Sequence, residues 1–227
     1  MKAIFLAAAA ALCIAAPAAA DTLVFADTFD AENGGIGAAE YSGFSLWTGA
    51  NVDLLAPGYF ANLCQLAGGA TPCVDMEGSG NGSLVTKAAY ALAPGNVTMT
   101  FDLAGDQRGR TGNGVTVSLT SVLGDVLFSE AFSLPSDADF TTFSRTITLA
   151  DPTSARLGFL SVGPADSMGM LLDNVVVRAG APVVSPIPEP ETWAMLWAGL
   201  GVVGAAARRR RSRAAGATGG EAAGGAS

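Results

Sequence analysis

The sequence contains no histidine, and it has few charged residues of either sign. Of its 227 residues 14% are charged, whereas about a quarter is usual for a soluble globular protein. The absence of histidine excludes Ser-His-Asp triads, Cys-His dyads and His-ligated zinc sites. Any catalysis would have to use carboxylate, hydroxyl or lysine chemistry. Glycine is abundant, with 29 residues. The composition therefore matches neither a charge-rich disordered chain nor an ordinary cytosolic enzyme.

The first 20 residues have the pattern of a secretory signal peptide. Lys2 is followed by an apolar run over 4–16 and by Ala18-Ala19-Ala20, an A-x-A cleavage pattern, directly before Asp21. We therefore expect export by the secretion machinery and cleavage by signal peptidase after residue 20. The alternative, a short N-terminal membrane helix, is disfavoured because the run is short and rich in small residues.

The C-terminal region combines three features in a fixed order. A proline-rich linker over 181–192 precedes an apolar stretch over 193–207, and an arginine cluster over 208–213 follows. The apolar stretch falls just short of the ~17–25 residues that span a bilayer, but flanking side chains can extend it, so we expect a transmembrane helix over 193–207. The arginines would act as the membrane stop on the cytoplasmic side: Arg208, Arg209, Arg210 and Arg211. The alternative is a buried core helix.

The segment from Pro188 to Arg211 resembles the PEP-CTERM sorting signal, which is also called the ice-binding protein C-terminal domain. The match rests on Pro188-Glu189-Pro190, on Trp193-Ala194-Met195 and on the arginines. This signal occurs on exported proteins of Gram-negative bacteria that make extracellular polysaccharide. It implies cleavage near the motif by an exosortase-like membrane enzyme, and release to the cell surface or extracellular matrix. Chains of this family usually end soon after the arginines, whereas here a disordered tail is expected over 214–227.

Residues 21–180 are expected to form one exported domain of β-strands. Val97, Met99, Phe101 and Leu103 alternate with polar residues, and the stretch 114–119 repeats this pattern. Further candidate strands, separated by turn signals, are 23–26, 44–48, 52–55, 84–92, 126–132, 143–149, 156–162 and 170–177. The pattern predicts an all-β fold, an antiparallel β-sandwich of jelly-roll type.

The same domain is strongly acidic. It contains 17 acidic and 6 basic residues, a net charge of −11. A surface of that sign argues against nucleic acid and anionic lipid headgroups as partners, because both bind clustered lysine and arginine. It is compatible with divalent cations and neutral glycans.

Two cysteines remain after removal of the signal peptide, which contains Cys13. Cys64 and Cys73 lie nine residues apart around a glycine-rich loop. In an exported protein such a pair is expected to form a disulfide. The alternative, a pair of metal-binding thiols, is disfavoured because there is no histidine and no second cysteine pair.

Several short segments of the domain are similar to segments of exported PEP-CTERM proteins with a galactose-binding-like jelly roll. Among them are Phe44-Ser45-Leu46-Trp47 and the run from Leu171 to Val175. In carbohydrate-binding modules of this superfold, an N-terminal acid often meets an aspartate of the last strand at a structural calcium ion. The resemblance therefore implies a Ca²⁺ site at Asp30 and Asp173, although these acids could instead solvate a loop or accept turn amides.

A glycan site would need aromatic rings on the surface. Tyr59 and Phe60, in the loop before Cys64, are the expected exposed pair, although an aromatic residue in a sandwich more often belongs to the core. The sequence thus predicts a non-catalytic surface or extracellular-matrix protein, and weak binding to extracellular polysaccharide is a further expectation.

An enzyme is the alternative function. A glycan hydrolase could use a pair of carboxylates, either Asp102 with Asp106 or Asp75 with Glu77. These acids also fit solvated strand ends and loops, which disfavours the enzyme. A Ser-Lys dyad is disfavoured as well, because the serine nearest before the only lysine of the domain lies four residues away rather than three.

Overall fold

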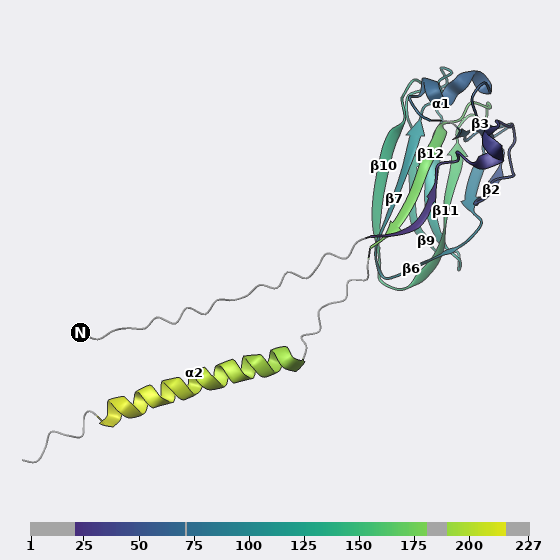
Figure 1. The fold of residues 1–227 in the computed structure, drawn as a ribbon. Helices are drawn as coiled ribbons and strands as arrows, with labels where there is room; N and C mark the ends of the chain where they lie inside the picture. Colours follow the sequence, from purple (N-terminus) through teal and green to yellow (C-terminus); the bar gives the residue numbers. More distant parts are fainter. Residues whose placement is uncertain (1–20, 71, 181–189, 217–227) are drawn as a thin grey trace, which may run out of the picture. The chain divides into compact units, whose positions relative to one another are not determined.

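The computed structural model of the protein describes residues 21–70, 72–180 and 190–216 (Figure 1). The chain divides into two compact units, residues 1–183 and 184–227. The first contains a β-sandwich, and the second contains the helix α2 (Pro190–Gly216). The expected signal peptide over 1–20, most of the expected linker and two sorting residues, Pro188 and Glu189, lie outside the described residues.

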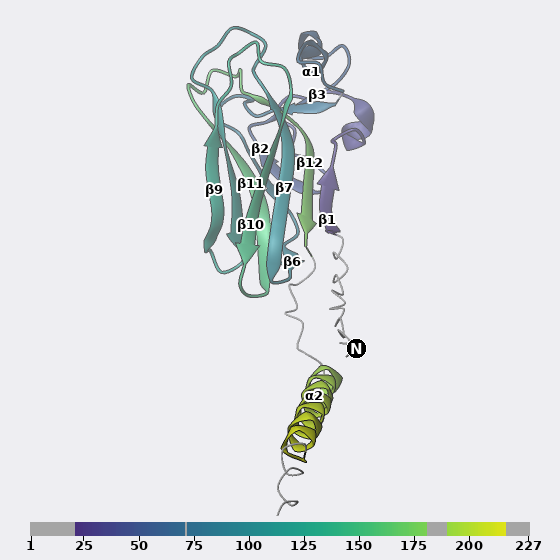
Figure 2. The ribbon, with the colours of Figure 1, turned by 90° about the vertical axis from the view of Figure 1, so that its left-hand side faces the viewer.

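Two six-stranded antiparallel sheets form the sandwich. Figures 1 and 2 show how their strands are arranged. Sheet A has the order β10-β7-β12-β4-β3, and its sixth strand, β1, also pairs with β12. Its strands are β1 (Thr22–Asp27), β3 (Asp53–Leu55), β4 (Cys73–Asp75), β7 (Gly95–Ala104), β10 (Thr141–Leu149) and β12 (Leu171–Ala179). Sheet B has the order β2-β5-β11-β8-β9, and its sixth strand, β6, also pairs with β11. Its strands are β2 (Trp47–Ala50), β5 (Ser83–Thr86), β6 (Tyr90–Leu92), β8 (Gly114–Ser121), β9 (Val126–Phe132) and β11 (Thr153–Val162).

The core lies between the two sheets, and the alternation of residues in the strands decides which side chains enter it. Val97, Met99, Phe101 and Leu103 of β7 are all fully buried, as predicted. The aromatic ring of Phe101 contacts Phe132, Phe143 and Phe159, and the ring centroids are 5.2–5.9 Å apart. Because these rings come from both sheets, they hold the two layers together. The predicted antiparallel β-sandwich is confirmed.

The segment expected as one strand over 84–92 forms two strands. β5 ends at Thr86 and β6 begins at Tyr90, and both pair with different parts of β11. Between them, the Lys87 ammonium donates a hydrogen bond of 2.5 Å to the carbonyl oxygen of Phe44. The sequence did not reveal the break because no glycine, proline, asparagine or aspartate marks a turn within 84–92.

Three short helical turns lie in loops of the sandwich. They are η1 (Glu32–Gly35), η2 (Phe60–Asn62) and α1 (Leu63–Leu66). The disulfide Cys64–Cys73 is confirmed, with the two Cα atoms 6.0 Å apart, and it ties α1 to the start of β4. Both cysteines belong to a small second core that also contains Leu55, Ala67 and Leu171. The bond therefore fixes a loop that the main core does not reach.

Replacing both cysteines with serine is expected to lower the free energy of unfolding by about 2.5 kcal/mol, because the closed loop restricts the unfolded chain. Urea unfolding of the variant and of the wild type would measure the difference. Titration of two thiols by a maleimide in the native wild-type protein would contradict the disulfide.

Helix α2 extends over more of the C-terminal region than the sequence indicated. It begins at Pro190, inside the expected linker, and continues past the arginines to Gly216, inside the expected tail. Proline fits the first turn of a helix because its missing N–H needs no partner there, and alanine and arginine favour helix. Among the described residues, no helix is both long and apolar enough to cross a membrane. A helix does cover the stretch 193–207, where a transmembrane helix was expected.

Candidate functional site

Four aspartates gather where β1, β7 and β12 meet, and we call them the β1–β12 acidic cluster: Asp27, Asp30, Asp102 and Asp173. Asp102 and Asp173 lie opposite each other across β7 and β12, and Asp27 lies opposite Val175 across β1 and β12. Like charges opposite each other on a sheet destabilise it. The pairing of strands distant in the sequence thus concentrates negative charge in one place.

Asp27 shapes the turn that carries Asp30. Its Oδ1 accepts the backbone N–H of Phe29 at 2.9 Å, and its Oδ2 accepts the indole N–H of Trp47 at 2.7 Å. Phe29 has a φ of 57°, a left-handed conformation that is uncommon for a bulky residue, and its ring is fully buried. A carboxylate and a core ring therefore hold this turn in place. Trp47 is a core residue as well, and it is fully buried.

A bulge in β12 positions Asp173. The register with β7 jumps from Asp173 opposite Asp102 to Val176 opposite Thr100, and Asn174 in between has a φ of 50°. The N–H of Asn174 donates to Asp173 Oδ1 at 2.7 Å, and its Nδ2 donates to Asp102 Oδ2 at 2.8 Å. Asparagine tolerates left-handed backbone better than most residues. It thus makes the bulge and connects two carboxylates of the cluster.

Burial raises the pKa of Asp173 to about 7. The N–H of Asn174 opposes the rise, whereas the negative charges of Asp30, Asp102 and Asp27 add to it. The Asp173 residue is 2% exposed, and no ion pair between described residues involves an acid of the cluster. A proton or a bound cation would relieve this repulsion.

Calcium would suit the charge of the cluster, because Ca²⁺ takes six to eight oxygen ligands. Asp30 and Asp173 are the predicted ligands, and they are close enough for the negative charge of Asp30 to raise the pKa of Asp173. In the described parts of the chain, however, no group of three or more His, Cys, Asp or Glu side chains is arranged to hold a metal ion. Carbonyl and water oxygens would have to supply most ligands, and the calcium site stays a prediction.

The predicted aromatic pair is only partly on the surface. Phe60 is 46% exposed, whereas Tyr59 is half-buried against the second core. Their ring centroids are 4.6 Å apart in an edge-to-face contact. The two rings therefore do not form one flat platform, although Phe60 is accessible. Glycan binding by this pair stays a prediction.

The acids of the alternative enzyme have structural roles. Asp75 is fully buried, and its Oδ2 lies 2.5 Å from the guanidinium of Arg108. Its Oδ1 accepts the N–H groups of Glu77 and Gly169, each at 3.0 Å. Burial raises the pKa of Asp75 to about 7, and the positive charge of Arg108 opposes that rise. Asp75 is therefore the centre of a buried ion pair that closes the loops over this end of β4.

Asp106 and Asp102 bind their own surroundings too. Asp106 is 1% exposed, and its Oδ1 accepts the N–H of Arg108 at 2.6 Å and the hydroxyl of Ser136 at 2.9 Å. Asp102 Oδ1 accepts the hydroxyl of Thr142 at 2.6 Å. Glu77, the partner proposed for Asp75, is fully buried as well, and one of its oxygens has no hydrogen-bond partner. The structure brings no pair of these acids together in an open cleft that the described residues form.

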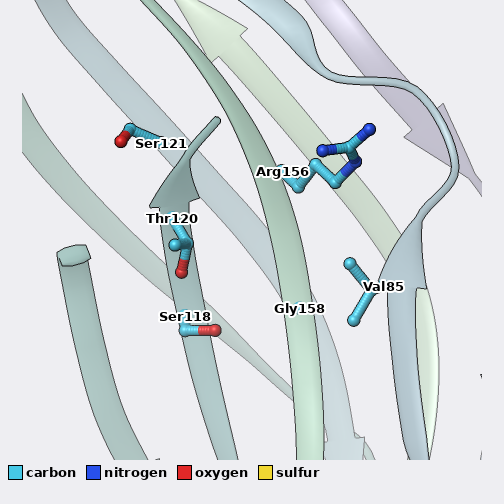
Figure 3. A pocket seen from close by; sticks show the side chains of 6 residues that line it. All are labelled: Val85, Ser118, Thr120, Ser121, Arg156 and Gly158. Carbon is cyan, nitrogen blue, oxygen red and sulfur yellow. The ribbon is translucent and has the colours of Figure 1, made fainter. Parts of the chain in front are cut away.

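A groove that the sequence did not predict lies on the outer face of sheet B (Figure 3). We call it the Gly158 groove; its volume is about 210 Å³, and it is lined by Val85, Ser118, Thr120, Ser121, Arg156 and Gly158. Gly158 lies opposite Ser118 of β8 and Val85 of β5, and Arg156 lies opposite Thr120. In Figure 3 the Ser118 hydroxyl points toward β11 at Gly158. A glycine within a strand signals such a hollow, but the residues on either side come from distant parts of the chain.

Comparison with known proteins identifies the C-terminal segment. Residues 186–211 match the family model described as the PEP-CTERM protein-sorting motif. The chain thus carries the sorting signal that its Pro-Glu-Pro tripeptide and arginines indicated. The match includes Pro190 and Trp193 of α2, together with Pro188 and Glu189 outside the described residues. A search of curated proteins finds no match to this sequence.

Several solved structures resemble the sandwich. The C-terminal CBM6 of LamC, a marine laminarinase from Zobellia galactanivorans, is 16% identical with a TM-score of 0.40, and the match covers 63% of this chain and 97% of that one. A family 35 carbohydrate-binding module from Clostridium thermocellum is 16% identical with a TM-score of 0.37, covering 59% and 92%. The K3 cleaved adhesin domain of Lys-gingipain from Porphyromonas gingivalis is 20% identical with a TM-score of 0.34, covering 49% and 75%. Because these TM-scores lie below 0.5, function must be argued from the residues of this chain.

Proposed function

We propose that this protein is a non-catalytic component of the cell surface or extracellular matrix that is sorted through its PEP-CTERM motif and binds glycans weakly. The motif at residues 186–211, downstream of a disulfide-bonded β-sandwich, carries the proposal. It implies export and processing by exosortase-type machinery. The disulfide agrees with an oxidising compartment outside the cytoplasm.

The burial of the candidate acids favours binding over catalysis. Glycoside hydrolysis needs two carboxyl groups that flank one sugar linkage in an accessible cleft. Asp75, Glu77 and Asp106 are at most 1% exposed. Asp75 is also committed to Arg108. These acids support loop structure, so the sandwich is better suited to hold a ligand than to cleave one.

Glycan binding is supported by the surface of sheet B. The Gly158 groove offers hydroxyl groups from Ser118 and Thr120 beside the guanidinium of Arg156. Sugars are recognised through several such polar groups placed beside apolar surface. Phe60, 46% exposed at another place on the domain, is the second candidate contact.

Replacing Glu189 with alanine is expected to leave unprocessed, membrane-associated precursor in cells that contain the sorting enzyme. The reason is that the substitution removes the charge from the Pro-Glu-Pro tripeptide that the enzyme recognises. Immunoblots of membrane and medium fractions would measure the ratio of precursor to released protein.

Glu191→Ala is the matched control, since it removes the same side chain from the residue directly after the tripeptide. This variant is expected to be processed like the wild type. Equal release of the Glu189→Ala variant and the wild type would overturn the proposed route of sorting.

A further inference from the structure

The negative charge of the domain is distributed unequally between its two sheets. Five of the six strands of sheet A contain an aspartate: Asp27, Asp53, Asp75, Asp102 and Asp173. The six strands of sheet B contain one acid, Glu130, whose Oε1 lies 2.6 Å from the guanidinium of Arg145 on β10. The strands of sheet B therefore carry little of the net charge of −11, and at the Gly158 groove one acid, Asp125 of the loop after β8, accepts the hydroxyl of Ser121 at 3.2 Å.

Arg156 is the basic residue of that surface. Four of the six basic residues of the domain have partners within it: Lys87, Arg108, Arg110 and Arg145. Arg156 is exposed and has no hydrogen bond or ion pair with the described residues; Arg178, on β12 of sheet A, is the other such residue. A guanidinium has five N–H donors in a planar fork that matches a carboxylate. At Arg156 this capacity is available to a ligand.

The Gly158 groove lies beside Arg156 and offers space for a ligand. Residue 158 has no side chain, and Ser118 and Val85 border it on either side; a Cβ there would lie 3.2 Å from Ser118 Oγ and 3.6 Å from Val85 Cγ2. Val85 is 39% exposed, and Leu160, the next outward residue of β11, is 49% exposed. The groove thus combines a cation, hydroxyl groups and apolar surface.

We propose that the Gly158 groove binds a carboxylate-bearing sugar residue of an acidic extracellular polysaccharide. Arg156 would bind the carboxylate through its guanidinium, and Ser118 and Thr120 would bond to hydroxyl groups of the same sugar. Val85 and Leu160 would contact its C–H faces. This inference rests on the proposed glycan-binding function and names its ligand class, in contrast to the neutral glycan that the net charge alone favoured. The strands of sheet B carry few acids, so the carboxylate of an acidic sugar complements the positive charge of Arg156 there.

The test compares oligogalacturonate with its methyl ester, which keeps the sugar and removes the charge. Isothermal titration of the full-length protein should show binding of oligogalacturonate, and at least tenfold weaker binding of the ester. Arg156→Gln should reduce the affinity for oligogalacturonate at least tenfold. Gly158→Val, which fills the groove, should do the same, with thermal melting as the check that it folds.

Two variants serve as controls. Arg178→Gln removes the other exposed, unpartnered arginine and should leave the affinity unchanged. The second, Phe60→Ala, removes the other candidate glycan contact and shows whether oligogalacturonate binds there instead. Oligogalacturonate binding is therefore predicted to depend on position 156 rather than on charge in general.

The outcomes separate this inference from the proposed function. Equal binding of the acid and its ester, or equal losses in Arg156→Gln and Arg178→Gln, would overturn the acidic-sugar site. If Phe60→Ala abolished binding and Arg156→Gln did not, the groove would be wrong and glycan binding would stand. If neither oligogalacturonate nor its ester bound, the site would again be overturned. If a panel of neutral oligosaccharides also failed to bind, glycan binding itself would fall, and sorting by the motif would remain.

Discussion

An Arg108→Ala variant is expected to lose about 3–5 kcal/mol of folding free energy at neutral pH. Asp75 is fully buried, and Arg108 holds it at 2.5 Å with a side chain that is 19% exposed. Removing the guanidinium leaves a buried carboxylate with two backbone N–H donors and no opposite charge. Chemical denaturation of the variant and the wild type would give the difference.

The loss should also depend on pH. Burial raises the pKa of Asp75 to about 7, and without Arg108 the pKa should rise further. A carboxyl group whose folded pKa exceeds its unfolded pKa contributes stability at low pH that is lost as the pH rises through the folded value. The variant should therefore lose more stability at pH 8 than at pH 5.

Arg110→Ala is the matched control for Arg108→Ala. Arg110 lies two residues away and pairs with Asp166 at 3.4 Å, with its own side chain 52% exposed. An exposed pair of this kind contributes about 0–1 kcal/mol. Equal losses in the two variants would contradict the structural role of the buried pair.

Asp173→Asn is expected to stabilise the protein at pH 8 in the absence of divalent cations, by roughly 2 kcal/mol. The pKa of Asp173 is about 7 in the folded state, well above the ordinary value for aspartate. Its contribution to stability is therefore complete below about pH 4 and is lost as the pH rises through 7. Asparagine carries no charge at any of these pH values, so the benefit of the variant should disappear at pH 4.

The control for this variant is Asp151→Asn, which removes one negative charge from an exposed position outside the acidic cluster. Stability measured by urea unfolding at pH 4, 6 and 8 should change little in this control. The other acid with a pKa near 7, Asp75, is present in both variants and cancels in the comparison. A benefit of Asp173→Asn that is equal at pH 4 and pH 8 would contradict the raised pKa.

The same variant tests the predicted calcium site at Asp30 and Asp173. If calcium binds there, it should raise the melting temperature of the wild type more than magnesium does at equal ionic strength, because magnesium requires a stricter octahedral geometry. Asp173→Asn should abolish that calcium-specific shift. Equal shifts with both ions would mean general screening of the acidic domain, and the site would be wrong.

Features encoded within one continuous stretch could be predicted from the sequence. The alternation of Val97, Met99, Phe101 and Leu103 predicted a strand with one buried face, because side chains alternate along every strand. The sorting motif was readable because its parts follow one another over residues 186–211. The Cys64–Cys73 bond was predictable because no other cysteine of the exported domain could compete. The break between β5 and β6 was missed, since no glycine, proline, asparagine or aspartate marks it.

The two charged sites depend on tertiary structure. Asp102 and Asp173 meet because β7 pairs with β12 in one particular register, and the bulge at Asn174 fixes that register locally. Asp75 ends β4, whereas its partner Arg108 lies in the loop between β7 and β8, and only the fold brings them together. Local periodicity says which face of a strand is buried, but it contains no information on which strand lies beside it.

The Gly158 groove likewise depends partly on the local sequence and partly on the tertiary structure. The sequence by itself determined that Arg156 and Gly158 share the outward face of one strand, because residues two apart point the same way. Only the packing of β5 and β8 on either side of β11 decided that Val85 and Ser118 border the missing side chain of Gly158. Strand order and register follow from burial of the whole core. They place Gly158 between β5 and β8, and the groove forms there.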